Sequence, residues 1–227
     1  MIGILCALDK EIELLLKEIA QPAVHKKLCG YDYVQGKLKG VDVVLCKCGV
    51  GKVNAAVCAQ TMILTWPVKL NINSGVAGAL REPYEIGDIC VATDIVQHDV
   101  DTTGVGDPVG LVSTVKQITF PTSDFAAAKA AMDKVGLPYR TGLVATGDWF
   151  AVPCRRTQWI ADTFHPLLCE MEGCAVAQVC MRNGVKCMAI KSVSDCLVVK
   201  HDYYFNFPTA MKDLNRVVMS FIDHLEV

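Results

Sequence analysis

The sequence predicts a single α/β domain whose central twisted sheet, mostly parallel or mixed, is flanked by helices. Strand-like apolar runs alternate with segments of helical periodicity along the whole chain, which is typical of this class. Hydrophobic residues make up 52% of the 227 positions, enough for a sizeable core. No repeat or low-complexity linker interrupts the alternation, so residues 1–227 are expected to form one domain.

The first elements form a strand, a helix and a hairpin. Ile2–Leu8 is a short continuous apolar run and predicts a strand buried on both faces. Asp9 follows in the position of a helix cap, and the next apolar residues have helical spacing: Ile12, Leu15, Leu16 and Ile19. Tyr33–Leu38 and Val41–Cys48 then predict a hairpin.

The middle of the chain alternates helices and strands. The predicted helices are Val53–Leu64 and Ser123–Val135, and the predicted strands are Leu70–Asn73 and Ile86–Ile95. Gln97–Ser113 is polar and rich in glycine, which indicates a long loop. Loops of this length tend to be either functional or mobile.

The second half continues the alternation. Gly142–Thr146 and the apolar run Val185–Val193 predict strands. Glu172–Arg182 predicts a helix that stops at Gly184, a residue suited to a left-handed C-terminal cap. Pro208–Leu225 predicts a final amphipathic helix.

Charge and composition exclude several classes of function. The 22 Lys and Arg against 24 Asp and Glu give a net charge of -2, which does not favour nucleic-acid phosphates. Twelve cysteines without a CxxC pair argue against zinc ribbons and thioredoxin motifs. They are typical of small buried hydrophobes in a reducing cytoplasm. The start lacks a basic export region, and the uncharged run 53–68 is too short and polar to span a membrane.

Glycine-rich and small residues follow several predicted strands, where sites of α/β proteins gather. Gly49–Lys52 is neither a Walker A loop nor a dinucleotide fingerprint, so a tight turn and a ligand contact remain equal alternatives. Ser74–Gly78 offers close backbone approach either to a ligand or to a packed helix.

Acidic residues occupy similar positions, each with a structural alternative. Glu11 lies in the first turn of a helix, where the dipole alone favours a carboxylate. Asp195 follows an apolar strand and is either a helix cap or a site residue. Glu170 and Glu172 share a face if their segment is extended, although a solvated turn is the simpler interpretation.

Two further clusters have simple structural interpretations. His98, Asp99 and Asp101 are metal-ligand types, and alternation would bring the two aspartates together, but no further cluster completes a site. A loop hydrogen-bond network is therefore favoured over a metal. Trp149 and Phe150 are most simply a core aromatic pair.

Taken in order, six segments resemble the 5′-methylthioadenosine/S-adenosylhomocysteine nucleosidases of the purine nucleoside phosphorylase and hydrolase superfamily. The segments are Leu5–Glu11, Gly49–Ala56, Asn73–Gly78, Thr146–Phe150, Glu170–Gly173 and Ser192–Asp195. No single motif is decisive, but the ordered set is specific and spans nearly the whole chain. The resemblance implies a three-layer αβα phosphorylase/hydrolase-like fold and a homodimer, with a nucleoside substrate and without metal or cofactor.

The resemblance also implies a reaction in which water cleaves the bond between adenine N9 and ribose. It assigns the role of general acid to Asp195 and the activation of the water to Glu11. The implied substrate-binding residues are Glu172 and Met171 at the sugar, Phe150 and the Ala151 backbone at adenine, Ser194 orienting the acid, and Leu8, Val50, Val76, Ala77 and Gly78. The implied lid or partner-facing residues are His98, Asp99, Asp101 and Val105.

The implied chemistry accounts for these residue types. Adenine leaves readily once it is protonated, so Asp195 needs a raised pKa from burial. An acid on one side and a base-held water on the other is the inverting arrangement of sugar hydrolysis. Glu172 would bind the sugar hydroxyls more strongly as the ribose becomes oxocarbenium-like.

Three positions depart from the family pattern. Val76 replaces a serine that helps to hold the water, Lys191 replaces an arginine, and Val105 replaces an aromatic residue that covers the 5′ end. Lysine keeps the charge of arginine but loses its planar fork. These departures leave the preferred 5′ substituent open.

Three alternatives compete with the hydrolase. A purine nucleoside phosphorylase would need phosphate donors, for which Lys52 and Arg81 are the candidates. An aminofutalosine nucleosidase would use the same acids. A nucleoside-binding module without activity would have no need of both Glu11 and Asp195.

Overall fold

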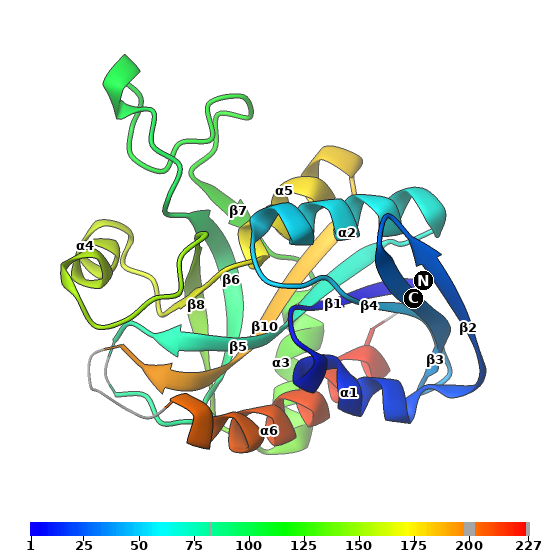
Figure 1. Ribbon diagram of the computed structural model, residues 1–227. Helices are drawn as coiled ribbons and strands as arrows, with labels where there is room; N and C mark the ends of the chain where they lie inside the picture. The colour runs from blue at the N-terminus through cyan, green and yellow to red at the C-terminus, as the bar shows by residue number, and fades with distance from the viewer. Residues whose placement is uncertain (82, 198–202, 226–227) are drawn as a thin grey trace.

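The strands of this chain form one mixed sheet that closes partly on itself (Figure 1). The computed structural model describes residues 1–81, 83–197 and 203–225, without the side chains of 203–206. The described strands are β1 (Ile2–Cys6), β2 (Ala20–Leu28), β3 (Tyr31–Leu38), β4 (Val41–Lys47), β5 (Leu70–Ala79), β6 (Ile89–Gln97), β7 (Thr119–Pro121), β8 (Tyr139–Thr146), β9 (Leu168–Glu170) and β10 (Lys186–Cys196). Their order is β10-β6-β8-β9-β5-β1-β4-β3-β2, with β7 on β6. An additional pairing of β10 with β5 closes a ring.

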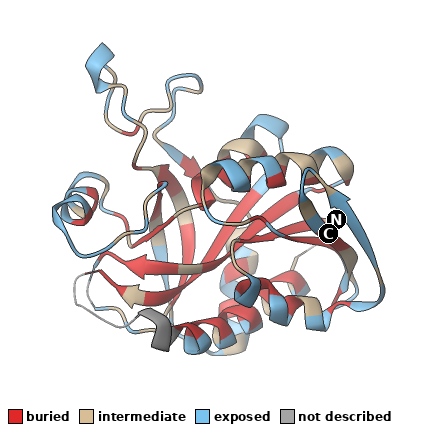
Figure 2. Ribbon diagram, in the orientation of Figure 1, coloured by how far each residue is buried: buried red, intermediate tan, exposed pale blue. Residues whose placement is uncertain are grey.

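Helices cover both faces of this sheet. The described helices are α1 (Asp9–Glu18), α2 (Lys52–Thr65), α3 (Phe125–Val135), α4 (Arg155–Phe164), α5 (Gly173–Asn183) and α6 (Tyr203–Asp223). One core cluster lies under α2 and α5, and a second lies under α1, α3 and α6. Figure 2 shows the central strands buried between helices whose outer faces are exposed, while the edge strand β2 is exposed. The prediction of a single α/β domain with helices on both sides of a mixed sheet is confirmed.

The long apolar elements were predicted correctly, and the short or exposed ones were not. Strand β2 was missed because nearly all of its side chains are exposed at the edge of the sheet, where it pairs with β3 alone. Helix α4 was missed because it is short, polar on most of its surface and buries only Thr157 and Ile160. Strands β7 and β9 span three residues each and carry too little pattern to detect.

Two strands extend further than predicted, and their additional residues include predicted site residues. Strand β5 continues through Ser74–Gly78, and β10 continues through Ser194 and Asp195. Asp195 is therefore a strand residue and not a helix cap. The cap assigned to Asp9 was also wrong: Leu8 is the N-cap residue, and the Asp9 carboxylate instead lies 2.6 Å from Lys47 Nζ.

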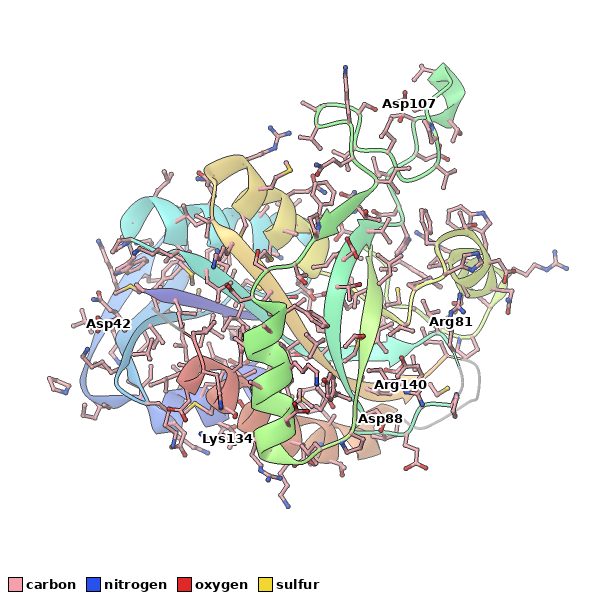
Figure 3. The ribbon with its side chains drawn as sticks, turned by 180° about the vertical axis from the view of Figure 1, so that it is seen from behind. Asp42, Arg81, Asp88, Asp107, Lys134 and Arg140 are labelled. Carbon is pink, nitrogen blue, oxygen red and sulfur yellow. The ribbon has the colours of Figure 1, made fainter. Side chains whose placement is uncertain are left out.

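The loop predicted over Gln97–Ser113 is present and longer than expected: it spans 98–118, and Gln97 is the last residue of β6. Figure 1 shows it projecting from the body of the molecule, with the short 3-10 helix η1 (Thr103–Val105) near its tip. Asp107, labelled in Figure 3, accepts hydrogen bonds from Thr102 at 2.8 Å and Ser113 at 2.5 Å. These bonds tie the two arms of the loop together.

The cysteines agree with the expectation of small buried hydrophobes. Ten of the twelve thiols are buried and all twelve are free, with Cys29 and Cys154 exposed. In the described part of the chain, no helix combines the length and apolarity needed to cross a membrane.

Candidate active site

A pocket of about 220 Å³ opens where β5, β10 and the start of α5 meet α1 and the segment after β8. All twelve residues that the sequence suggested for catalysis or substrate binding line it: Leu8, Glu11, Val50, Val76, Ala77, Gly78, Phe150, Ala151, Met171, Glu172, Ser194 and Asp195. Five further residues line it as well: Ala7, Trp149, Cys169, Glu170 and Leu197. Ala7, Trp149 and Glu170 lie inside the segments that carry the resemblance, and Cys169 and Leu197 lie just outside them, so membership of or proximity to those segments was the available signal.

Glu11 is a buried carboxylate held entirely by backbone donors. Its Oε2 accepts the N–H groups of Ala7 at 2.8 Å and Leu8 at 2.9 Å, and its Oε1 accepts that of Val76 at 3.0 Å. These bonds join the start of α1 to β5. Burial raises the pKa of Glu11, against the lowering effect of these donors and of Lys191. A carboxylate with a raised pKa is a better base than an exposed one.

The small residues of β5 make room for two of the acids that line the pocket. A Cβ atom on Gly75 would lie 2.6 Å from Glu11 Oε1, and one on Gly78 would lie 3.0 Å from the Leu197 side chain and 3.2 Å from Asp195 Oδ2. Glycine at position 75 therefore serves the Glu11 carboxylate, and glycine at position 78 leaves room for both Leu197 and Asp195. Neither of the two explanations from sequence, ligand approach or helix packing, covers this role.

Asp195 owes its position to an irregularity in β10. The register between β10 and β5 shifts between Val193 and Asp195, so Ser194 is the extra residue and Asp195 pairs with Gly78. Bulges of this kind often turn a side chain toward a site. Ser194 Oγ donates to Asp195 Oδ1 at 2.8 Å, which fixes the carboxyl group at the pocket.

Glu172 faces the glycine loop that precedes α2. Its Oε1 accepts the N–H of Gly51 at 2.8 Å, and Gly51 has a φ of 97°, which glycine adopts without strain. Burial, together with the charge of Glu170, raises the pKa of Glu172 to about 7. The loop thus makes a tight turn and also binds a pocket residue, while Val50 lines the pocket itself.

The predicted solvated turn around Glu170 was wrong, because both acids of this segment are buried. Glu170 forms an ion pair with Lys191 at 2.9 Å, and each side chain is 2% exposed. Burial alone would raise the pKa of Glu170, but Lys191 and the surrounding donors hold it below its ordinary value. The two partners are 21 positions apart on different strands, so no local pattern indicates the pair.

The segment after β8 forms the aromatic wall. Phe150 is 54% exposed at the pocket, so the prediction of a core aromatic pair was wrong for this residue. Trp149 is partly buried and packs under the guanidinium of Arg156 at 4.6 Å. An exposed aromatic ring beside a cavity is suited to stacking on a flat ligand.

Asp99 belongs to a hydrogen-bond network, as the sequence suggested. Its carboxylate binds Lys52 Nζ at 2.5 Å and accepts the N–H of Asp148 at 2.7 Å. Asp148 in turn accepts the N–H of Lys52 at 2.8 Å. This network connects the start of α2 to the segment that carries Trp149 and Phe150.

The other members of that sequence cluster lie elsewhere. Asp101 accepts the N–H of Thr103 at 2.9 Å, so alternation does not bring it beside Asp99. His98 is buried with its Nε2 3.8 Å from Cys169 Sγ, and burial lowers its pKa. Val105 is 82% exposed on the projecting loop. Within the described residues, no group of three or more His, Cys, Asp and Glu could hold a metal ion.

The family model of the phosphorylase superfamily matches residues 1–223, and the fold is that of this superfamily. The nucleosidase of Shewanella frigidimarina that acts on 5′-methylthioadenosine and S-adenosylhomocysteine is 35% identical over 197 residues, 86% of this chain and 85% of that protein. The chain belongs to the 5′-methylthioadenosine/S-adenosylhomocysteine nucleosidase family within this superfamily.

Solved structures give the same result. The nucleosidase of Neisseria meningitidis in complex with methylthio-immucillin-A superposes with a TM-score of 0.93 at 28% identity, covering 99% of both chains. The Colwellia psychrerythraea nucleosidase in complex with adenine has a TM-score of 0.93 at 30% identity and covers 99% of this chain and 95% of that one. Helicobacter pylori futalosine hydrolase has a TM-score of 0.88 at 29% identity, covering 98% and 95%.

Proposed function

We propose that this protein hydrolyses the N-glycosidic bond of 5′-methylthioadenosine, S-adenosylhomocysteine or both, releasing adenine and a 5-thioribose. The observation that carries the proposal is the presence of Glu11, Asp195 and Glu172 around one small pocket. A binding module would need the last of these for a sugar, but it would have no use for an acid and a base together.

Asp195 protonates adenine N7 in this proposal and so makes the base a competent leaving group. Ser194 orients the acid through its 2.8 Å hydrogen bond. Phe150 stacks on the adenine ring, and the backbone of Ala151 hydrogen-bonds its edge. The bulge in β10 supports this assignment, because it pairs Asp195 with Gly78 at the pocket.

Glu11 activates the attacking water, and Glu172 binds the ribose hydroxyls with Met171 against the sugar. Glu11 is held by three backbone N–H groups, so its carboxylate is fixed in position before substrate binds. The N–H that it accepts from Val76 comes from the backbone. Replacement of the family serine by valine therefore leaves the position of the base intact and removes a hydroxyl near the water.

Two observations favour water over phosphate as the nucleophile. Lys52 lies between Asp99 at 2.5 Å and Asp148 at 3.5 Å, so its charge is already neutralised. Arg81 does not line the pocket; its Nε donates to the carbonyl of Pro166 at 3.3 Å, and Figure 3 shows it beside α4. Of the two cations proposed from sequence for a phosphorylase, neither is presented for phosphate.

The substrate is tested with a panel of nucleosides that differ at the 5′ position. We expect kcat/KM for 5′-methylthioadenosine and S-adenosylhomocysteine to exceed that for adenosine by at least tenfold. Aminofutalosine is included because a futalosine hydrolase shares the fold. A higher kcat/KM for aminofutalosine than for either thio nucleoside would reassign the substrate. If none of the four nucleosides (5′-methylthioadenosine, S-adenosylhomocysteine, adenosine and aminofutalosine) is cleaved, the proposal that the protein is a nucleosidase is overturned.

We also propose that the protein is a homodimer with the projecting loop 98–118 facing the second copy. The loop supports this by carrying Val105, an apolar side chain that is 82% exposed. Light scattering measures the mass directly. A dimer by mass that becomes a monomer in Val105→Asp supports the assignment, and a monomeric wild type contradicts it.

A further inference from the structure

Beneath the sugar side of the pocket lies a buried polar cluster to which the proposed reaction assigns no role. It consists of Glu170 at the end of β9, Lys191 on β10 and Thr146 at the end of β8. Lys191 Nζ donates to Glu170 Oε2 at 2.9 Å, and Thr146 Oγ1 donates to Glu170 Oε1. A buried ion pair is costly to form unless further hydrogen bonds complete it, so its other contacts indicate its purpose.

Those contacts all lead to the first residues of α5. Glu170 Oε2 accepts the N–H of Glu172 at 3.0 Å, and both carboxylate oxygens accept the N–H of Gly173, at 2.8 and 2.9 Å. Thr146 Oγ1 accepts the next N–H, that of Cys174, at 2.9 Å. Helix N-termini leave such groups without intrahelical partners, and this cluster binds three in succession.

The close approach depends on glycine at the start of the helix. A Cβ atom on Gly173 would lie 3.1 Å from Glu170 Oε1 and 3.2 Å from Asn73 Oδ1. The carboxylate therefore fits against the backbone of the helix start. Between Glu170 and Gly173 lie Met171 and Glu172, the two side chains assigned to the sugar.

We propose that Glu170, held by Lys191 and Thr146, is a positioning residue that fixes Met171 and Glu172 against the ribose. Glu170 acts through the backbone of the turn and through its charge on Glu172. The kinetic part of the inference rests on the proposed nucleosidase reaction. The structural part concerns the turn itself and does not depend on turnover.

The charges around Glu172 give the proposal a distinctive signature. Glu172 interacts with the charges of Glu170, Lys191 and Glu11, and the thiols facing this cluster are Cys6, Cys48, Cys169, Cys174 and Cys187. Burial is the main cause of the raised pKa of Glu172; Glu170 raises it further and Lys191 lowers it. Removing the Glu170 charge is therefore expected to lower the pKa of Glu172, and removing the Lys191 charge is expected to raise it where Glu170 stays ionised.

The test compares Glu170→Gln, Lys191→Met and the double variant, with Lys186→Met as the matched control. Lys186 lies on the same strand but pairs with Asp124 at the surface, with 60% of its side chain exposed. Carbon-13 NMR of carboxyl-labelled glutamate, with the Glu172 signal assigned through Glu172→Gln, reports its titration without any substrate. The kcat and KM of each variant are measured alongside.

We expect opposite titration shifts for Glu172 in the two single variants and no shift in Lys186→Met. Turnover of Glu170→Gln should fall by about 10²-fold because the sugar contacts are misplaced, while free adenine binds within about threefold of wild type. Lys191→Arg keeps the positive charge, so it should retain most of the turnover that Lys191→Met loses. Lys191→Met leaves the Glu170 charge buried and unpaired and could therefore fail to fold. The double variant carries neither charge, so it provides a folded comparison in that case.

Two results would overturn the positioning role. One is wild-type turnover in Glu170→Gln. The other is a Glu172 titration that is unchanged in Glu170→Gln. A wild-type enzyme that cleaves no nucleoside would overturn the proposed function instead, and the NMR titration would still decide the inference.

Discussion

Glu172 carries the clearest consequence of burial at the scale of single residues. Its pKa is about 7 in the folded protein against an ordinary 4.5. The folded state then binds the proton more tightly than the unfolded chain, so the free energy of unfolding falls as pH rises from 4.5 to about 7. Above that range the loss is complete and constant.

Glu172→Gln should remove this pH-dependent loss in the free energy of unfolding. The amide oxygen can still accept the Gly51 N–H but carries no charge, so the variant should unfold at higher temperature than wild type at pH 8.5. The gain is at most about 3 kcal/mol, and it should vanish near pH 4. Thermal melts at both pH values measure it, and a variant less stable than wild type at pH 8.5 would contradict the account. Turnover should be lost, since the neutral amide binds the developing cation poorly.

Asp195→Asn tests the acid at the same scale. The amide cannot supply a proton to adenine, so turnover should fall by at least about 10²-fold while the melting temperature stays within a few degrees. Asp42→Asn is the matched control: this surface aspartate pairs with Lys37 at 2.8 Å and lies far from the pocket (Figure 3). Wild-type activity in Asp195→Asn would refute the role.

At the scale of elements, β5 leaves room for the base Glu11 because Gly75 has no side chain. Gly75→Ala would place a methyl group 2.6 Å from Glu11 Oε1, whose carboxylate is held by three backbone donors and cannot move freely. We expect a loss of turnover of about tenfold or more with little change in substrate KM. Gly104→Ala, where nothing lies within 4 Å, is the control. Equal turnover in the two variants would show that the glycine does not serve Glu11.

Elements also set the limit of prediction from this sequence. Strands buried on both faces, such as β1, and helices with a clear stop, such as α5 at Gly184, are marked by local pattern. The edge strand β2 and the three-residue β9 are defined by pairing with distant strands. The bulge at Ser194 depends on the register between β10 and β5, which no local property of Ser194 or Asp195 encodes.

At the scale of the whole molecule, the residues that line the pocket could be predicted from the ordered motifs of the sequence. The buried ion pair beneath the pocket could not. Glu11, Glu172 and Asp195 stand in segments that resemble a known family, so their convergence was foreseeable. The pairing of Glu170 with Lys191 joins the end of β9 to the middle of β10 inside the protein. It depends on burial, which the sequence of an acidic turn does not reveal.

The central claim concerns the whole enzyme: that water, held by Glu11, attacks the sugar as Asp195 releases adenine. The most direct test incubates the protein with 5′-methylthioadenosine in phosphate-free buffer and identifies the sugar product by mass spectrometry, with and without added phosphate. The account predicts adenine and free 5-methylthioribose at the same rate in both conditions. Phosphate-dependent cleavage with a sugar 1-phosphate as the product would contradict it.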